Sequence, residues 1–180
     1  MILEDSLITA LKSPETKEAA FRSLVDQYKE RLYWHIRKMV YAHEDTDDVL
    51  QNTFIKVHRN IDSFKGDSKL YTWLYRIATN EAITFINKRS KQMQVSSQEV
   101  QERAVQNLQA DVYFEGDEIQ YKLQKAIASL PQKQQQVFNL KYFDGMKYED
   151  MSQVLETSVG ALKSSYHIAV KKITAHVLGD

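Results

Sequence analysis

Residues 62–91 read DSFKGDSKLYTWLYRIATNEAITFINKRSK, and this stretch determines the fold that we expect. Apolar residues recur at three- and four-residue spacing, which predicts a helix over residues 69–88 with one buried face. The loop before it and the exposed helix face mix aromatic rings with cations. Cations bind phosphate and aromatic rings replace lost base stacking, so the mixture is typical of a surface that holds an unstacked base. The expected buried residues are Leu70, Leu74, Ile77, Ala78, Ala82 and Phe85.

The remainder of the chain also has the composition of a helical protein. Only 5 glycines and 2 prolines occur in 180 residues. Ser13-Pro14 has the pattern of a cap followed by a first-turn proline, which predicts a helix beginning there. A second helix is predicted to begin near Asp45, where a cluster of acids suits the helix dipole. We therefore expect an all-α protein.

Helical periodicity resumes at Glu118, and Pro131 begins a further predicted helix that is followed by two short ones. These cover about residues 148–155 and 159–177 and are joined by a short turn, which is the length pattern of a helix-turn-helix. Ser158 is predicted to cap the last helix. The outer face of that helix is polar, as expected of a face that enters the major groove.

Residues 92–117 separate the two helical units and are rich in Gln, Ser and Glu. We interpret them as a flexible linker that joins a domain of residues 1–91 to a domain of residues 118–180. The formal net charge is zero, but the linker carries five acids and one cation, whereas residues 69–91 carry five cations and one acid. Residues 160–178 add three lysines and no acid. The neutral total therefore hides two basic surfaces, which is the charge pattern of a nucleic-acid-binding protein.

Several classes of protein are excluded by composition. The chain has no cysteine and no apolar run near the roughly 18 residues of a membrane span, so we expect a cytoplasmic protein that is not inserted in a membrane. A glycine-rich phosphate loop, a thiol nucleophile and a recognisable catalytic triad are all absent from the sequence. The histidines lack the three- or four-residue spacing of a helical metal site. We expect no enzyme, no cofactor, no metal and no small-molecule substrate.

Three blocks of sequence follow one another in a distinctive order. They are DVLQNTF at residues 48–54, FKGDSKLYTWLYRIATN at residues 64–80, and a block over residues 130–164 that contains YFDG and ends in SVGALKS. In their order and spacing they resemble the extracytoplasmic-function (ECF) sigma factors, small members of the sigma-70 family that direct bacterial RNA polymerase to promoters. The resemblance covers nearly the whole chain.

The resemblance implies a sigma factor that binds core RNA polymerase and directs promoter-specific transcription initiation. Residues 1–91 would form sigma region 2, which binds the clamp of the largest polymerase subunit and recognises and melts the −10 element. Residues 118–180 would form the sigma region 4 helix-turn-helix domain, which contacts the flap of the second-largest subunit and recognises the −35 element. The protein would be nucleoid-associated in the holoenzyme. An anti-sigma factor is a further partner that the family implies.

The resemblance also implies a set of residues for each surface. The clamp-binding residues would be Asp47, Asp48, Gln51, Asn52 and Lys56. The residues that bind the −10 element and the flipped base would be Phe64, Lys65, Asp67, Ser68, Lys69, Trp73, Arg76, Asn80, Lys88 and Arg89. The residues that bind the −35 element would be Ser158, Gly160, Ala161, Lys163, Ser164, His167 and Lys171. Trp73 is interpreted either as a wedge between bases or as a core residue.

The chain departs from its relatives at several of these positions. Asn52 stands where relatives usually carry Glu, and Ser165 and Ile168 stand where they often carry Arg. Because a guanidinium that recognises guanine contributes about 1–3 kcal/mol of discrimination, the promoter sequence is not carried over. Lys147 replaces a common Ser or Thr cap, and Glu156 occupies a turn position often filled by Gly, which predicts slight strain there.

A stand-alone helix-turn-helix transcriptional regulator is the alternative. Such a protein would use only the carboxy-terminal helices and would normally dimerise on paired half-sites. It would have no use for the aromatic and cationic stretch at residues 62–91. The sigma factor is therefore the hypothesis that uses both basic surfaces.

Overall fold

The computed structural model of the chain describes residues 4–111 and 114–179. These ranges are helical and contain no strand, which confirms the all-α expectation, and none of their helices is both long and apolar enough to cross a membrane. The α-helices are α1 (Glu4–Lys12), α2 (Lys17–Val40), α3 (His43–Asn60), α4 (Leu70–Met93), α5 (Ser97–Gln106), α6 (Glu118–Ala128), α7 (Gln132–Phe138), α8 (Tyr148–Leu155) and α9 (Val159–Leu178). Shorter helical segments are η1 (Ile61–Ser63), η2 (Leu108–Ala110) and η3 (Asn139–Phe143), the last of which is a π-helix.

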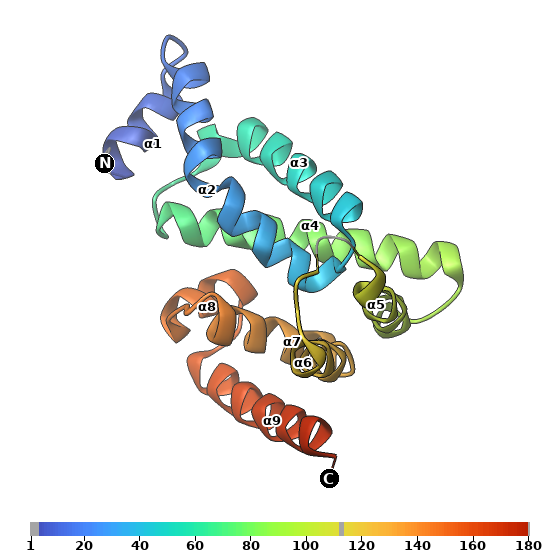
Figure 1. The fold of residues 1–180 in the computed structure, drawn as a ribbon. Helices are drawn as coiled ribbons and strands as arrows, with labels where there is room; N and C mark the ends of the chain where they lie inside the picture. The colour runs from blue at the N-terminus through green and yellow to red at the C-terminus, as the bar shows by residue number, and fades with distance from the viewer. Residues whose placement is uncertain (1–3, 112–113, 180) are drawn as a thin grey trace.

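The amino-terminal half packs α2, α3 and α4 side by side, with α1 at one end (Figure 1). Helix α4 buries Leu70, Leu74, Ala78 and Ala82 on one stripe, which confirms most of the predicted face; Ile77 and Phe85 are only partly buried. The helix extends beyond the predicted end at residue 88 and stops at Gln94, which adopts a left-handed conformation. The stretch that opened the sequence analysis therefore forms the central helix of this half.

The carboxy-terminal half contains the predicted helix-turn-helix, formed by α8 and α9. The hydroxyl of Ser158 accepts a hydrogen bond from the amide of Ala161 at 3.3 Å, which confirms the predicted cap. Glu156, in the turn, has φ +51°, so the position where glycine was expected does adopt a left-handed conformation. A side chain there costs about 1 kcal/mol relative to glycine.

The first helix of the chain differs from the prediction. Ser13-Pro14 does not begin a helix but lies in the turn between α1 and α2, where the amide of Lys17 donates to the carbonyl of Ser13 at 2.9 Å. Helix α1, which precedes this turn, was not predicted. It buries only Leu7 and Leu11, one turn apart, and two apolar residues are too short a pattern to identify a helix.

The segment expected to be a linker is partly folded. Helix α5 lies within residues 92–117 and begins with a capping box between Ser96 and Glu99. Val100 and Val105 are buried, and the side-chain amide of Gln101 donates to the carbonyl of Met39 at 3.0 Å. Residues 112 and 113 of the expected linker lie outside the described residues. Part of the expected linker thus forms a packed helix, and the division of the chain into residues 1–91, 92–117 and 118–180 stays a prediction.

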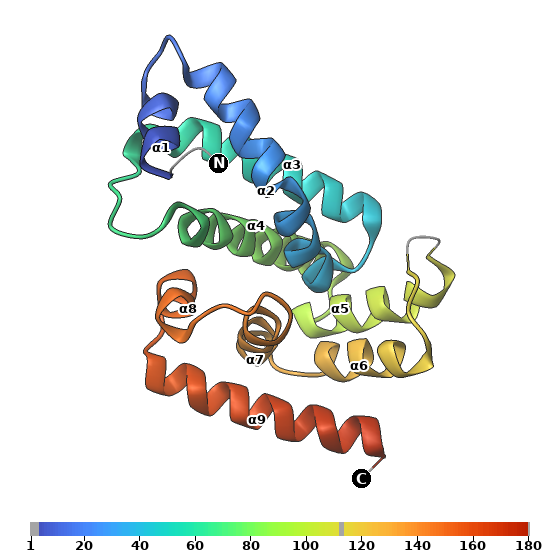
Figure 2. The ribbon, with the colours of Figure 1, turned by 60° about the vertical axis from the view of Figure 1, so that its left-hand side comes forward.

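The two halves pack against each other, and α8 lies along α4 in both ribbon views (Figure 2). A single apolar cluster includes Met151 and Val154 of α8 together with Leu74 of α4. Beside it, Asp144 accepts hydrogen bonds from His35 Nδ1 at 3.1 Å and Lys38 Nζ at 3.0 Å. We call these three side chains the Asp144 cluster.

The Asp144 cluster is electrostatically favourable although it is buried. The side chains of Asp144 and His35 are 8% and 2% exposed. Burial alone would raise the pKa of Asp144, but the hydrogen bond and charge of His35, and then those of Lys38, outweigh it and hold that pKa below its usual value. Ionised Asp144 therefore stabilises the contact between the two halves.

The connection between α2 and α3 carries an unusual backbone turn. Tyr41 has φ 65° and ψ −37°, and the amide of Ala42 donates to the carbonyl of Val40 at 2.8 Å, so Tyr41 is the central residue of a γ-turn with positive φ. The ring is buried, and its hydroxyl has no hydrogen-bond partner among the described residues. Burial raises the pKa of Tyr41 well above its usual value.

We expect Tyr41→Phe to stabilise the chain, because it removes a buried hydroxyl that lacks a partner. The free energy of unfolding in urea should rise by about 1 kcal/mol. Tyr142→Phe is the matched control, since Tyr142 is 57% exposed and its substitution should leave stability unchanged. A destabilised Tyr41→Phe variant would show that the hydroxyl has a favourable partner.

We expect Asp144→Asn to destabilise the chain in a pH-dependent way. Because the folded pKa is lowered, the contribution of the carboxylate is present above the unfolded pKa and is lost as the pH falls through the folded pKa. At pH 7 the free energy of unfolding of Asp144→Asn, measured in urea, should be about 2 kcal/mol lower than that of the parent chain. This difference should shrink below about pH 4. Asp26→Asn, which breaks an exposed pair with Lys29, should change stability by less than about 1 kcal/mol. A pH-independent loss in Asp144→Asn would contradict this account.

Candidate nucleic-acid interface

A pocket of about 410 Å³ lies between the loop that precedes α4 and the exposed side of α8. We call it the loop pocket. Six of the predicted −10 residues line it, namely Phe64, Lys65, Asp67, Ser68, Trp73 and Arg76. The facing wall is formed by Ser152 and Gln153 of α8 and by Glu156 in the turn that follows it. The structure thus brings the aromatic and cationic residues of the loop and helix to one site.

An aromatic pair forms one side of the loop pocket. The rings of Phe64 and Trp73 have centroids 5.1 Å apart and are tilted by 49°. Both side chains are buried, at 3% and 8% exposure. Trp73 therefore belongs to the core, as one of its two interpretations predicted, and borders the pocket from there. In this structure the Trp73 ring is not placed as a wedge that could enter between bases.

Thr72 also lines the loop pocket but was absent from the predicted set. It lies on the same face of α4 as Arg76, one turn away, because the two residues are four positions apart. That spacing was the signal that could have identified it. Its hydroxyl adds a hydrogen-bonding group between the aromatic pair and the guanidinium.

Acids of α8 contact the cations beside the loop pocket. Asp150 Oδ2 lies 3.2 Å from Lys69 Nζ and also accepts a hydrogen bond from the Tyr71 hydroxyl. Burial and then this hydrogen bond raise the pKa of Tyr71 to about 12. Glu156 Oε1 lies 3.7 Å from Arg76 Nη1. Two predicted phosphate-binding cations are thus engaged by the carboxy-terminal half.

The remaining predicted −10 residues lie farther along α4. Asn80 and Lys88 are exposed and do not line the loop pocket. Arg89 pairs with Asp45 near the start of α3, and its guanidinium lies 5.6 Å from the centroid of the Phe85 ring. The predicted set therefore divides into residues at the pocket and residues along the helix that leads away from it.

The predicted −35 residues share the outer face of α9 and its amino-terminal turn. Lys163 lies over the ring of Tyr148, with Nζ 5.8 Å from the centroid. A Cβ built on Gly160 would meet no atom within 4 Å, so the packing of the chain does not require glycine there. All of the set are exposed: Ser158, Gly160, Ala161, Lys163, Ser164, His167 and Lys171. This face of α9 is open to solvent, whereas the loop pocket is bordered on one side by α8.

The predicted clamp-binding residues lie on α3. Asp47 pairs with His43 at 3.3 Å, and Lys56 pairs with Glu81 of α4. The five predicted residues are all exposed: Asp47, Asp48, Gln51, Asn52 and Lys56. They form a polar outer surface of the amino-terminal half.

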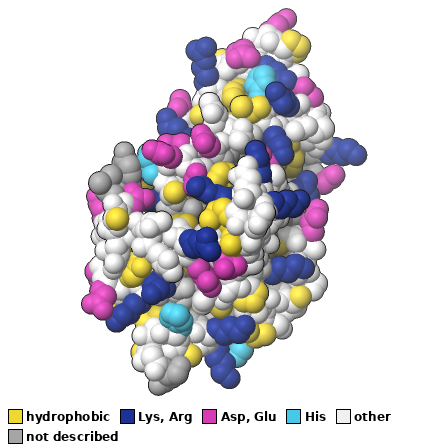
Figure 3. All heavy atoms as spheres, turned by 90° about the vertical axis from the view of Figure 1, so that its right-hand side faces the viewer, with side chains coloured by type: hydrophobic (Ala, Val, Ile, Leu, Met, Phe, Trp, Pro, Cys, Tyr) yellow, Lys and Arg dark blue, Asp and Glu magenta, His cyan; other side chains and the backbone are white. Residues whose placement is uncertain are grey.

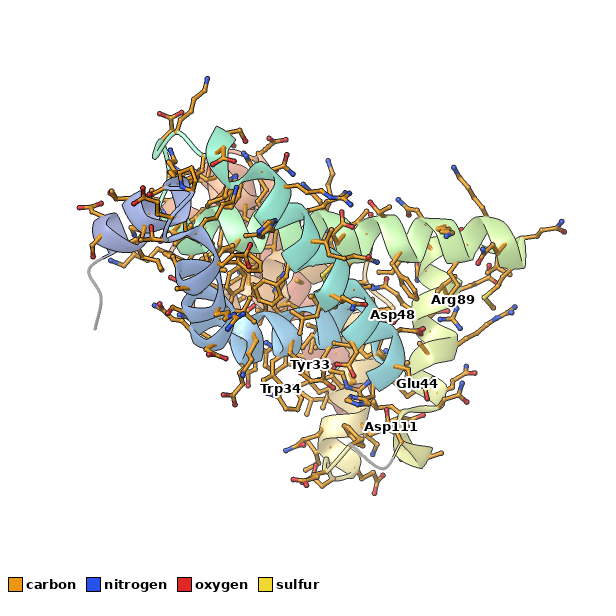
Figure 4. All side chains as sticks on the ribbon, turned by 90° about the horizontal axis from the view of Figure 1, so that it is seen from above. Tyr33, Trp34, Glu44, Asp48, Arg89 and Asp111 are labelled. Carbon is orange, nitrogen blue, oxygen red and sulfur yellow. The ribbon has the colours of Figure 1, made fainter. Side chains whose placement is uncertain are left out.

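Two exposed apolar residues near that surface were missed. Trp34 is 47% exposed and Ile55 is 42% exposed. Figure 4 shows Trp34 and Tyr33 of α2 on the same side of the molecule as Asp48 of α3. The exposure of Trp34 could have been predicted from the sequence, because Trp34 falls outside the helical stripe that contains the buried residues Leu32 and Ile36.

Charges of both signs are distributed over the surface. On the face seen in Figure 3, Lys and Arg side chains are interspersed with Asp and Glu, as the zero net charge suggests. That face shows no broad patch of one sign. Local geometry, more than net charge, must provide any affinity for nucleic acid.

Comparison with protein families identifies both halves. Residues 24–92 match the model of sigma-70 region 2, and residues 120–173 match that of sigma-70, region 4. The RNA polymerase sigma-H factor of Pseudomonas aeruginosa is 31% identical over 153 residues, which cover 81% of this chain and 79% of that protein. The ECF RNA polymerase sigma factor SigW of Bacillus subtilis is 31% identical over 156 residues, which cover 82% of this chain and 83% of that protein.

Solved structures show a similar fold. The structure of CnrH in complex with the cytosolic domain of CnrY matches with a TM-score of 0.72 at 21% identity and covers 98% of each chain. The sigma factor RpoE in complex with the anti-sigma factor NepR from Bartonella quintana matches with a TM-score of 0.66 at 22% identity, over 88% of this chain and 96% of that one. With both family regions present in order, the chain belongs to the extracytoplasmic-function group of the sigma-70 family of RNA polymerase sigma factors.

Proposed function

We propose that this chain binds core RNA polymerase and directs promoter-specific initiation, with residues 1–91 melting the −10 element and residues 118–180 recognising the −35 element. The polymerase supplies catalysis, and the chain supplies recognition and strand separation in the cytoplasm, on the nucleoid when in the holoenzyme. The observation that carries the proposal is the loop pocket, where an aromatic pair and two cations, Lys65 and Arg76, meet within the region 2 match. A stand-alone regulator is not favoured, because it would not need region 2.

At the −10 element, the loop pocket would receive a base extruded from the duplex. Extruding a base is unfavourable by a few kcal/mol, and stacking on an aromatic ring is favourable by about 1–3 kcal/mol per base, which offsets part of that free energy. Phe64 and Trp73 border the pocket and would have to shift from their buried positions to stack on a base, and Asp67 and Ser68 provide polar groups there. The cations Lys65, Lys69, Arg76, Lys88 and Arg89 would hold the backbone of the opened strand, and Asn80 would contact a base beyond the pocket.

At the −35 element, the exposed face of α9 would enter the major groove. Lys163, Ser164 and His167 would contact base edges, and Gly160 would let the backbone of α9 approach a phosphate. The other members of the set, Ser158, Ala161 and Lys171, would contact phosphates.

Two polymerase subunits and one regulator are the proposed partners. The exposed surface of α3, extended by Trp34 and Ile55, would bind the clamp of the largest subunit, and region 4 would contact the flap of the second-largest. An anti-sigma factor is proposed because the similar sigma factor RpoE was solved in complex with one.

The isolated chain should bind promoter DNA weakly. Lys69 and Arg76 are engaged by Asp150 and Glu156 in this structure, so phosphates would have to displace those carboxylates. Helix α8 also forms one wall of the loop pocket. Polymerase would therefore have to separate the two halves before the −10 strand could enter.

Transcription from a promoter library with purified core polymerase tests the function directly. Start sites should appear only when the chain is added, and the aligned upstream sequences should show two elements at fixed spacing. An absence of both initiation and core binding would overturn the proposal.

We expect Trp34→Ala to weaken binding to core polymerase. An exposed Trp at an interface commonly contributes about 2 kcal/mol, which is about 30-fold in affinity. Leu178→Ala is the control, because Leu178 is also a large exposed apolar residue but lies at the end of α9. Competition binding to core polymerase checks the effect. Equal affinities for the parent chain and Trp34→Ala would place the clamp contact elsewhere.

We expect the double variant Asp150→Asn/Glu156→Gln to bind single-stranded −10 DNA about tenfold more tightly than the parent chain, because two cations are released for phosphate. The slope of log affinity against log salt should steepen by about 1.4 for the same reason. Glu149→Gln/Glu30→Gln is the control with the same change in net charge, since Glu149 and Glu30 are exposed. Fluorescence anisotropy provides both readouts. If the control and the double variant gain equally, net charge and not the release of Lys69 and Arg76 is responsible.

A further inference from the structure

Helix α1 lies outside the matched region 2, which begins at residue 24, yet it packs beside the loop that shapes the pocket. Leu7 and Leu11 anchor α1 in the core, and α1 contacts both α2 and η1. Figure 2 shows α1 at the end of the molecule where the chain passes from η1 into α4. The helix is therefore placed to act on that loop.

Residues 4–17 contact the loop and its flanks at three points. Lys12 Nζ donates to the carbonyl of Phe64 at 2.5 Å, and Lys17 Nζ pairs with Asp62 at 2.9 Å. Glu4 Oε1 accepts a hydrogen bond from the amide of Leu70 at 2.5 Å. These contacts hold the start and the end of the loop over residues 64–69.

The loop has few other anchors. Among the described residues, no backbone–backbone hydrogen bond involves residues 65–68. Gly66 has φ +80°, which gives the loop its turn but does not hold it. The position of the loop therefore depends on side-chain contacts, namely the packing of the buried Phe64 ring against Trp73 and the bond from Lys12 to the Phe64 carbonyl.

Glu4 has a second role at the start of α4. The cap residue Lys69 makes no side-chain capping bond, and the first turn of α4 contains no acid. Glu4 supplies the missing acceptor from another helix, and its charge suits the positive end of the helix dipole. This explains why an acid lies close to a surface proposed to bind phosphate.

We infer that Glu4 and Lys12 are positioning residues for promoter opening, an inference that rests on the proposed function. They hold the carbonyl of Phe64 and the amide of Leu70, so the loop is ordered before a base enters. A preordered loop binds the base without first losing its own conformational entropy, which lowers the free energy of the opened state. Neither side chain needs to touch DNA.

The test compares Glu4→Met/Lys12→Met, which removes both the acceptor at Glu4 and the donor at Lys12, with the parent chain, each assembled with core polymerase. Opening is followed by the fluorescence of a base analogue in the −10 element, and duplex binding is measured separately at low temperature. The rate of opening should fall about tenfold, while affinity for core polymerase and for duplex promoter should stay within twofold. Lys12→Arg keeps a donor and should open promoters near the parent rate.

Asp5→Asn and Lys29→Met are controls that make the same charge changes at exposed positions, and both should open promoters normally. If Glu4→Met/Lys12→Met opens at the parent rate, the inference is overturned and the proposed function stands. If core binding, duplex binding and opening fall together, α1 has only a general folding role, which also overturns it. Failure of the unaltered chain to initiate counts instead against the proposed function.

Discussion

The packing of α8 along α4 is the constraint on which the rest of the structure depends, because α4 must satisfy two neighbours at once. One stripe of α4, with Leu74 and Ala78, faces the core of the amino-terminal half. A second stripe, with Thr72 and Thr79, is also buried, which leaves α4 with a weak amphipathic pattern for a surface helix. His35 bonds Thr79 at 2.8 Å and Asp144 at 3.1 Å, so a single imidazole links α4 to the carboxy-terminal half. The region proposed to bind an opened strand is thus also the region that joins the two halves.

The interactions across this contact differ in strength because they differ in burial. Arg76 and Glu156 have side chains that are 42% and 79% exposed, so their pair contributes only about 0–1 kcal/mol. Lys69 is 56% exposed, but its partner Asp150 is 11% exposed and also accepts a hydrogen bond from Tyr71. The apolar cluster and the Asp144 cluster are buried and hold the halves together more firmly. Phosphates can therefore compete for the exposed cations, but separation of the halves also has to break the buried contacts. A partner with a large interface is suited to supply that free energy.

The sequence predicted the elements that have long local patterns and missed those that depend on distant partners. Helices α4 and α9 were found because their apolar stripes run for several turns, and the Ser158 cap was found from its residue type. Helix α5 could have been found, since Ser96 and Glu99 have the spacing of a capping box, but its Gln-rich composition suggested a linker. The pairs that join the halves link residues about 80 or more positions apart, as Lys69 and Asp150 do, and no local pattern indicates them. For the same reason Glu4 could not be recognised as the cap of a helix 66 residues away.

The 24 acids and 24 cations that give a zero net charge are not evenly placed over the two proposed DNA surfaces. The acids of the carboxy-terminal half that matter most face the cations of α4, whereas α9 turns its lysines outward and keeps them uncovered. The two proposed DNA surfaces are therefore unequal in the closed chain. In the proposed function, duplex DNA would reach the exposed face of α9 without rearrangement, whereas a strand entering the loop pocket would have to pass α8, which lines one side of it. In the proposed function, binding of the opened strand is thus coupled to separation of the two halves. The loop pocket would bind the strand only where core polymerase holds the two halves apart.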